Sequence, residues 1–552
     1  MKNAIYFHPE AYSTNGPKLM GRNAAGEGFL RGYFAHSQAQ SFTALVPKAE
    51  YGAAFADAVK VAGRQEPAIF VTKAALQRLV NYGSVFYPGP GLGEHAWQRA
   101  LFGHASWSLC GITHTLCSGR AMDAVTELLT APVQPWDALI CTSSAGKDAV
   151  QRLLQAQAEF LVARLGAQKL VLPQLPIIPL GVHCSDFVFT QEQRRVARQK
   201  LGATDKTQIV LFAGRLSFHA KAHPLAMFQA LEAASRSLAD DEDLLLVQFG
   251  QFPNKHIENA FTAAAHLAAP SLRIKTLDGS QIDNRNTAWS AADIFCSLSD
   301  NIQETFGLTP VEAMAAGLPA VVSDWDGYKD SIRNGVDGFR IPTLMPGAGL
   351  GTDLALRHAL EIDSYDMYCG YTSSLVAVDV QAAERAFTTL LTDKALRQRM
   401  AKAARLRACE EFDWSVIIPR YEALWAELAE IRKAQAKDHP RSQYPWPARM
   451  DPFHGFASYP STLLNPEIRF CLVDPKLSDA LIRLEAYQKL DMVNFVKAII
   501  PSDNELRSVL SGLKDAAHSA AELVGNVEAD RKAAVFRALA WLAKMNLIRA
   551  VS

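Results

Sequence analysis

The sequence lacks an excess of charge of either sign, because 56 Lys and Arg residues balance 56 Asp and Glu residues in a chain of 552. A protein without a general basic field is not expected to bind nucleic acid, and one without an acidic excess is not expected to be disordered. No apolar run approaches 18 residues, so no transmembrane helix is predicted. The opening residues, "MKNAIYFHPE", hold only four apolar residues in a row before His8, which excludes a signal peptide.

Paired cysteine motifs are also missing. The eight cysteines include no CxxC pair, and the seven-residue step from Cys110 to Cys117 fits no usual zinc site. Reduced thiols in a cytoplasmic protein are the simplest explanation. No internal repeat or low-complexity segment is present, and no cluster of metal ligands stands out.

What is present is an alternation of short apolar runs with longer amphipathic segments, which predicts βα units and parallel sheets. The expected helices include "SAGKDAVQRLLQAQAEFLVARLG" and the long "WSVIIPRYEALWAELAEIRKAQA". The runs expected to be strands or strand ends are "AIYF", "FTALVP", "AIFVT", "SVFYPG", "ALICTS" and "KLVLPQLPIIPLGV" in the first half, and "IVLFAGRL", "LLLVQFG", "LRIKTLDG", "IFCSLS" and "PAVVSD" in the second.

We expect an α/β protein with two doubly wound, Rossmann-like domains, residues 1–181 and 182–438, that face a cleft. The segment 175–182, "LPIIPLGV", is interpreted as the hinge between them. Residues 439–460 hold five prolines among many aromatic residues and are expected to form a linker or a strap, in which Tyr444, Trp446, Phe453, Phe456 and Tyr459 are apolar anchors.

Residues 461–552 are expected to form a mainly helical C-terminal appendage. Val535, Leu539, Leu542 and Met545 share one helical stripe, which is more typical of a core than of a partner site. The appendage is expected to serve acceptor recognition, partner recognition or oligomerisation, or else to be a passive bundle.

The stretch "ETFGLTPVEAMAAGLPAVVSD" places two carboxylates, Glu304 and Glu312, eight positions apart around the start of a helix. Thr309 to Glu312 has the form of a capping box, with Pro310 at the first helical position, and Gly317 is expected at the C′ position. The "FGLT" loop therefore presents free N–H groups at a helix N-terminus, which attracts anions and phosphate above all. Capping alone could explain Glu312 but not Glu304.

Two cations follow a strand of the same domain in "IVLFAGRLSFHAKAHP", namely Arg215 and Lys221. Cations at a strand end beside an amide-lined loop can hold a diphosphate. In the first domain Gly21, Gly26 and Gly28 are expected to allow a tight turn and close approach of the backbone to a ligand. His114, in "GITHTLCS", lies at the end of another segment of this domain. A lone histidine is more often structural than functional.

The loop from Glu304 to Glu312 resembles the Glu–seven residues–Glu motif of retaining glycosyltransferases, most closely those of family 4 (group 1). "FAGRLSFHAKAHP" is similar to that family's Gly-Arg-Leu…Lys segment, with one extra residue between Arg215 and Lys221. "PLGVHCSDF" resembles the family's interdomain segment and "FDWSVIIPRYEALW" its terminal helix. The resemblance covers roughly residues 1–435.

This resemblance implies a GT-B fold, a nucleotide-diphosphate sugar as donor, no cofactor and no metal. It implies that Glu304 binds hydroxyls of the donor sugar and that Glu312 binds the ribose. Arg215 and Lys221 would neutralise the leaving diphosphate, Gly26 would let the backbone approach the phosphates, and His114 would contact the sugar near the reacting carbon. The backbone amides that would meet sugar and phosphate belong to Phe306, Gly307, Leu308 and Thr309.

The sequence thus favours a metal-independent retaining glycosyltransferase whose acceptor is a glycan, a lipid-linked group or a protein. The sequence is compatible with peripheral membrane contact and with an oligomer formed through the C-terminal region. The alternatives are another GT-B enzyme, such as a sugar-nucleotide 2-epimerase, and a catalytically idle GT-B scaffold that acts through its C-terminal region. The donor base, the sugar and the linkage are not specified by these residues.

Overall fold

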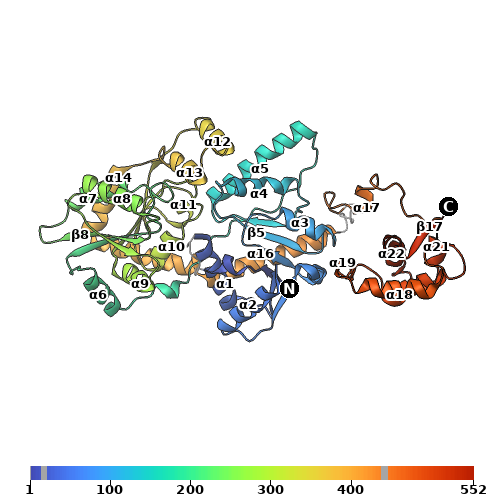
Figure 1. The fold of residues 1–552 in the computed structure, drawn as a ribbon. Coiled ribbons are helices and arrows are strands. Elements are labelled where there is room, and N and C mark those ends of the chain that lie inside the picture. Colours follow the sequence, from blue (N-terminus) through green and yellow to red (C-terminus); the bar gives the residue numbers. More distant parts are fainter. Residues whose placement is uncertain (1, 14–20, 437–444, 552) are drawn as a thin grey trace. The chain divides into compact units, whose positions relative to one another are not determined.

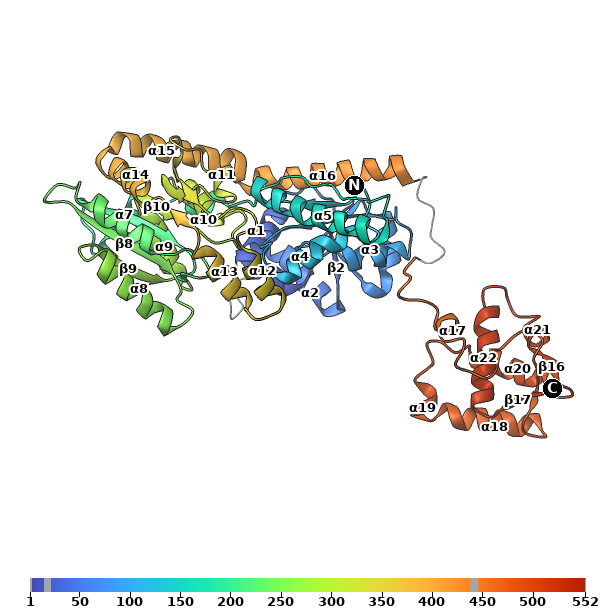
Figure 2. The same ribbon diagram turned by 90° about the horizontal axis from the view of Figure 1, so that it is seen from above.

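The structure is a computed structural model that describes residues 2–13, 21–436 and 445–551. The chain divides into two compact units, Met1–Trp446 and Pro447–Ser552, which we call the first and the second unit. The first unit contains two parallel six-stranded sheets, each covered by helices (Figures 1 and 2).

The first sheet has the strand order β3-β2-β1-β4-β5-β6, and all neighbouring strands in it are parallel. The strands are rich in β-branched and aromatic residues and mostly buried, as strands covered on both faces must be. Their bounds are β1 Ala4–Tyr6, β2 Phe42–Val46, β3 Ala68–Thr72, β4 Ser84–Phe86, β5 Ser108–Ile112 and β6 Ala138–Ile140. The strand order reverses between β1 and β4, and ligands of doubly wound sheets bind at this switch point.

Helices cover both faces of this sheet (Figure 1). They are α1 Gly21–His36, α2 Ala49–Val61, α3 Gly93–Ala100, α4 Gly119–Thr126 and α5 Ser144–Leu165, with short 3-10 turns η1 Pro9–Tyr12, η2 Lys73–Asn81 and η3 Glu127–Leu129. The tight turn expected at Gly21, Gly26 and Gly28 is wrong, because all three lie in α1. The helix forms in spite of its glycines because its apolar side chains, among them Phe29, Leu30 and Phe34, are buried, and tertiary packing supplies most of a helix's stability. Residues 15–20, which directly precede Gly21 in the sequence, lie outside the described residues.

The second sheet repeats this topology, with the order β12-β11-β10-β7-β8-β9 and parallel neighbours throughout. Its strands are β7 Thr207–Ala213, β8 Asp243–Gly250, β9 Arg273–Asp278, β10 Ile294–Ser297, β11 Ala320–Ser323 and β12 Gly338–Ile341. Its helices are α6 Gln191–Lys200, α7 Leu225–Ser235, α8 Lys255–Ala268, α9 Ile282–Ala291, α10 Leu308–Ala315, α11 Tyr328–Ser331, α14 Val380–Thr392 and α15 Lys394–Arg407, with the turns η4 Cys184–Phe187 and η5 Ala408–Phe412. The switch point here lies between β7 and β10, so the two Rossmann-like domains of the expected GT-B fold are present.

The closing helix α16, Trp414–Gln435, packs on the first domain although it follows the second in sequence. The ring centroid of Tyr421 lies 5.6 Å from that of Phe86, and the Trp425 centroid lies 6.2 Å from it. Residues of both domains consequently share one buried apolar cluster.

Trp414, at the start of α16, lies against three glycines of the first unit. A β-carbon added to Gly28, Gly32 or Gly181 would come within 2.5–3.2 Å of the indole. The indole is 1% exposed, so the glycines leave just enough room for it. The packing of the closing helix on the first domain therefore depends on glycine, which has no β-carbon, at these three positions.

An insertion follows the second sheet. It starts at β13, Thr343–Leu344, and returns through β14, Ala377–Val378, which pairs antiparallel with β13. Between these strands lie α12, Thr352–Ala359, and α13, Tyr365–Ser373. Figure 2 shows α12 beside α4 of the first domain, and a β-carbon added to Gly119 at the start of α4 would lie 3.9 Å from His358 Nε2 of α12.

The second unit has its own core, as the stripe of apolar residues predicts. Val535, Leu539 and Leu542 are at most 1% exposed, and Met545 packs partly buried against them. The unit is mainly helical, with α17 Pro452–Gly455, α18 Leu477–Gln488, α19 Asp491–Asn494, α20 Asp503–Gly512, α21 Ala520–Leu523 and α22 Lys532–Lys544. It also holds a three-stranded antiparallel sheet, β16-β15-β17, formed by His518–Ser519, Arg469–Leu472 and Ile548–Val551. Residues 439–444 of the expected strap, with Tyr444, lie outside the described residues.

The stretch "KLVLPQLPIIPLGV" differs from its interpretation as a strand. It makes only isolated bridges, at Gln174 to Ala138 and at Ile177 to Cys141 beside the edge strand β6, and at Val182 to Asp413 just before α16. Three prolines remove backbone donors from this segment, so a continuous ladder cannot form.

Candidate active site

The helix behind the "FGLT" loop begins two residues earlier than the capping box predicts. The N-cap of α10 is Gly307, with no side-chain cap, and Thr309 lies inside the first turn. The Thr309 hydroxyl is buried and has no hydrogen-bond partner. The predicted capping box is therefore wrong, although Pro310 is still within the first turn, where its missing N–H leaves no helical bond unmade.

Gly307 is required at this helix start by both backbone and space. Its φ of 83° lies in the left-handed region, and a β-carbon would overlap the ring of Tyr328. The Tyr328 hydroxyl is itself fixed 2.9 Å from the Ser297 hydroxyl at the end of β10. At the other end of α10, Gly317 has φ 71°, its N–H donates to Met314 O, and Leu318 N–H donates to Ala313 O. This is the Schellman C-terminus that Gly317 predicted.

Lys221 and Glu304 form an ion pair across the switch point of the second sheet. The loop after β7 carries Lys221 and the loop after β10 carries Glu304, and their side chains are only 14% and 17% exposed. Burial by itself lowers the pKa of Lys221, but the charge and hydrogen bond of Glu304, together with Tyr328 and Asp326, outweigh it, so the pKa is raised and the ammonium stays charged. The sequence reasoning had placed both residues in one site, and the structure brings them into contact.

A third charged group, Asp326, adjoins this pair and was not identified from the sequence. Its pKa is raised well above the usual value by burial and by the negative charge of Glu304. The Oδ2 atom is buried without a partner, and the residue has a φ of 39°, which is unusual for a non-glycine. The available signal was its position in "DWDG", directly after the expected strand "PAVVSD", where doubly wound sheets place ligand-binding residues.

Arg215 lies at the solvent-exposed edge of the same site. Its guanidinium donates to Ala220 O at 2.9 Å and to Gln303 Oε1 at 2.7 Å, and so connects the loop after β7 to the residue before Glu304. One edge of the site thus carries an exposed cation, and its interior carries a paired one.

Glu312 lies on the first turns of α10 and does not cap the helix. Burial raises its pKa, while the charges of Arg285 and Lys221 act in the opposite direction. The nearby loop residues differ in exposure, since Phe306 is 2% exposed and packs against Phe412, whereas Leu308 is half-buried. The first N–H groups of α10, which follows the loop after β10, have no acceptors within the helix.

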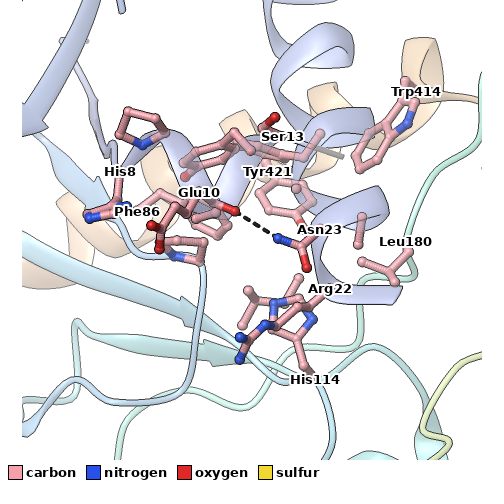
Figure 3. A pocket seen from close by; sticks show the side chains of 18 residues that line it. His8, Glu10, Ser13, Arg22, Asn23, Phe86, His114, Leu180, Trp414 and Tyr421 are labelled. Carbon is pink, nitrogen blue, oxygen red and sulfur yellow. Dashed lines mark hydrogen bonds between the residues drawn. The ribbon is translucent and has the colours of Figure 1, made fainter. Parts of the chain in front are cut away.

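The first domain has a cavity of about 900 Å³ at the carboxyl ends of β1, β4 and β5 (Figure 3). Figure 3 shows Glu10, Asn23, Arg22 and His114 around one space, with Asn23 Nδ2 donating to Glu10 O at 2.7 Å. The cavity is lined by His8, Pro9, Glu10, Ala11, Tyr12, Ser13, Arg22, Asn23, Ala25, Gly26, Phe29, Phe86, Pro88, Ile112, His114, Leu180, Trp414 and Tyr421. Aromatic rings thus form much of one wall, and charged and amide groups form another.

His114 and Gly26 both line this cavity, whose lining among the described residues includes neither Lys221 nor Glu304. Burial lowers the pKa of His114 to about 4, so its imidazole is neutral at pH 7. A β-carbon on Gly26 would overlap Ala11 O, so the glycine allows η1 to pack directly on α1. The Trp414 Nε1 and Tyr421 hydroxyl groups are buried without partners.

The two domains are connected beside the Glu304 loop. Ser143 Oγ donates to Thr305 O at 2.5 Å, and the Asp330 carboxylate accepts from Ser144 N at 2.6 Å and from Ser144 Oγ at 2.5 Å. Sequence reasoning missed these residues, because contacts between domains leave no periodic signal.

The described residues contain no group of three or more His, Cys, Asp or Glu side chains that is arranged to hold a metal ion. Over residues 2–13, 21–436 and 445–551, no helix is long and apolar enough to cross a membrane.

Residues 193–344 match the family described as glycosyl transferases group 1. A D-inositol 3-phosphate glycosyltransferase of Geodermatophilus obscurus is 30% identical over 227 residues, which cover 38% of this chain and 47% of the relative. A phosphatidyl-myo-inositol mannosyltransferase of Mycobacterium leprae is 30% identical over 152 residues, 27% of this chain and 31% of the relative. The chain spans about half the length of the curated relatives it matches.

Among solved structures, a glycosyltransferase from Rickettsia africae is similar with a TM-score of 0.50 and 14% identity, covering 77% of this chain and 98% of the other. At this identity the likeness concerns the fold, and it agrees with the arrangement of the two sheets. The match to group 1 ends at Leu344, where the insertion with α12 and α13 begins.

Proposed function

We propose, from the match of residues 193–344 to the glycosyl transferases group 1, that the protein transfers a sugar from a nucleotide-diphosphate sugar to a hydroxyl-bearing acceptor. The observation that carries the proposal is the buried pair of Lys221 and Glu304 beside the N-terminus of α10. A donor needs a cation for its diphosphate and an acceptor of hydrogen bonds for its sugar hydroxyls, and this pair supplies both at one switch point.

In the proposed donor complex the diphosphate lies between the N–H groups at the start of α10 and the cations Lys221 and Arg215. The helix terminus and the two cations stabilise the charge that develops on the diphosphate as the bond to the sugar breaks. Glu304 accepts hydrogen bonds from sugar hydroxyls, and Glu312 from the ribose. The amides of residues 306–309 meet the sugar and the phosphates.

His114 faces the sugar from the first domain, where its neutral imidazole can donate or accept a hydrogen bond near the reacting carbon. Gly26 brings the first domain's backbone close to the phosphates. No side chain is assigned as a nucleophile, and retention of configuration follows from the resemblance to retaining enzymes. Positioning and preorganised charge supply the catalysis. Because two cations and a helix terminus already oppose the phosphate charge, we propose that no metal ion is needed.

The acceptor is proposed to enter the cavity of the first domain. Its polar wall, with Glu10, Arg22 and Asn23, can bind hydroxyl and anionic groups. The names of two relatives contain D-inositol 3-phosphate and phosphatidyl-myo-inositol, so inositol 3-phosphate is the first compound to test as an acceptor.

The test is a panel of UDP-, GDP- and ADP-sugars screened for thermal stabilisation, followed by product analysis with and without acceptors in excess chelator. A donor at a hundredfold its dissociation constant should add about 2.7 kcal/mol of stability. Conversion of one nucleotide sugar into another without an acceptor would support a 2-epimerase instead. Binding without any conversion would support an idle scaffold, and activity that chelator abolishes and magnesium restores would contradict metal independence.

A further inference from the structure

The insertion after β13 contacts both domains of the first unit. From α13, the Tyr365 hydroxyl lies 3.2 Å from the Thr115 hydroxyl, which belongs to the loop after β5 in the first domain. On the other side, Gly370 packs so closely on His219 that an added β-carbon would lie 2.9 Å from its Cβ. His219 lies in the loop that also carries Lys221. The insertion therefore connects the first domain to the cation-bearing loop of the second.

Two thiols meet where the insertion contacts the first domain. The Sγ atoms of Cys117 and Cys369 are 3.7 Å apart, although 252 positions separate the residues. Cys117 is 8% exposed and Cys369 is fully buried, and neither is in a disulfide. A disulfide has an S–S distance of about 2 Å, so the two sulfur atoms need to approach by less than ~2 Å.

We propose that Cys117 and Cys369 are a site of reversible oxidation, at which a disulfide fastens the insertion to the first domain. The bond itself depends on the thiol geometry alone. Its effect on turnover rests on the proposed function, because transfer requires the site to admit donor and acceptor and to release products.

The surroundings assign different roles to the two thiols. The hydrogen bond shared with Cys369, and those shared with Thr115 and Tyr365, lower the pKa of Cys117 against the opposing effect of burial. The same shared hydrogen bond, together with burial, raises the pKa of Cys369. Cys117 is therefore the thiol that ionises first and is also the more exposed, and both properties favour attack on an oxidant.

The reaction needs an oxidant, and a low-molecular-weight disulfide, RSSR, supplies it. The Cys117 thiolate attacks one sulfur of RSSR, forms a mixed disulfide and releases RS⁻. Cys369 then loses its proton and attacks Cys117 Sγ, which expels the second RS⁻. The two cysteines lose two electrons and two protons, and both are recovered in two molecules of RSH.

The link would hold the loop after β5 and the loop with Lys221 at a fixed separation through α13. Opening of a lid or domain often limits release of products, so a covalent link at this place is expected to slow turnover. Reduction of the disulfide would restore the rate of turnover.

The experiment treats the full chain with oxidised glutathione, alkylates the remaining thiols and maps the tryptic peptides by mass spectrometry. The expected product joins the peptide of residues 100–120 to the peptide that contains Cys369, and dithiothreitol reverses it. Cys110 shares the first peptide, so Cys117→Ser identifies the reacting sulfur by abolishing the link. Cys471→Ser, which removes a partly exposed thiol of the second unit, is the matched control and should still form the link.

Free Cys117 and Cys369 after oxidation, or a link that persists in Cys117→Ser, would overturn the assignment. A second readout is hydrogen exchange over residues 343–378, which should slow on oxidation of the wild-type chain and not of Cys369→Ser. Equal exchange in linked and reduced protein would show that the bond does not fasten the insertion. Unchanged transfer by linked protein would overturn the effect on turnover and leave the proposed function standing, whereas absence of transfer in reduced protein would count against the function alone.

Discussion

The ammonium of Lys221 and the carboxylate of Glu304 neutralise each other at the switch point of the second sheet, in a position where both side chains are largely buried. A buried charge that loses its partner is strongly destabilised, so each residue positions the other as well as any ligand. Asp326 lies near the pair as a second carboxyl group, and the negative charge of Glu304 helps to raise its pKa after burial, the larger cause.

We expect Glu304→Gln to remove most transfer activity while the chain stays folded. Loss of one preorganised polar contact to the reacting sugar should raise the barrier by about 3 kcal/mol, on the order of a hundredfold in kcat. Steady-state rates and circular dichroism measure the two effects. Glu192→Gln, which changes an exposed carboxylate, is the control. Near-normal turnover of the first variant would remove Glu304 from the donor site.

Arg215→Ala should weaken binding of a nucleoside diphosphate more than binding of the matching monophosphate. The guanidinium is exposed at the edge of the site and is proposed to meet the distal phosphate. Calorimetric titration of both ligands gives the two affinities, with Arg195→Ala as a surface control. Equal losses for both ligands would place Arg215 away from the diphosphate.

Glu312→Gln should weaken nucleotide binding without lowering stability at pH 8. No capping bond is lost, because α10 is not capped by this residue. Burial raises the pKa of Glu312 above its unfolded value, so the native state loses stability as pH rises through that interval, and an amide avoids this loss. Urea unfolding and nucleotide titration test the two parts. A clear loss of stability at pH 8 would indicate a structural role that the contacts do not show.

Asp300→Asn should make unfolding less dependent on pH. The carboxyl group is 3% exposed, and burial raises its pKa to about 7. The unfolded chain releases this proton near pH 4, so wild-type stability should fall between about pH 4 and 7, by up to roughly 4 kcal/mol. Urea unfolding at pH 5 and 8 should show a gain for the variant that is clearly larger at pH 8 than at pH 5. The control is Asp241→Asn, at an exposed ion pair, which should show no such gain in stability. If the stability of Asp300→Asn depended on pH as that of the wild type does, Asp300 would be excluded as the cause.

A chain that ends after Trp446 should fold and bind the donor nucleotide. The first unit contains both switch points, and the second unit has a separate apolar core. We propose that residues 447–552 serve acceptor recognition, partner recognition or oligomerisation, so transfer to the natural acceptor or the assembly state should change. Thermal shift with nucleotide and light scattering measure the two. A folded first unit that binds no nucleotide would assign the second unit to the site.

Most of the first unit could be predicted, because buried parallel strands are continuous apolar runs that need no knowledge of their partners. Four strands of the first unit were missed, namely β5, β12 and the two-residue strands β13 and β14. "SLCGI" and "GFRI" are short and interrupted by glycine or arginine, and only pairing with neighbours makes them strands. The strands of the second unit were missed for the same reason.

The sequence predicted several residues of the site but not how they are arranged. Glu304, Lys221 and Arg215 were found because they follow recognisable strands. The helix start was wrong because the turn at Gly307 is set by its contact with Tyr328, 21 positions away, and local capping rules do not contain that contact. Asp326, Asp330 and the thiol pair depend on contacts between segments far apart in the chain.

The packing of Trp414 against Gly28, Gly32 and Gly181 has a consequence for how this chain can diverge. An alanine at Gly32 or Gly181 would collide with the indole, and a smaller residue at position 414 would leave a cavity between the closing helix and the first domain. Neither change is neutral alone, whereas the two together can compensate. These four positions should therefore vary jointly among relatives of this protein, as a covarying set that spans the two ends of the first unit's sequence.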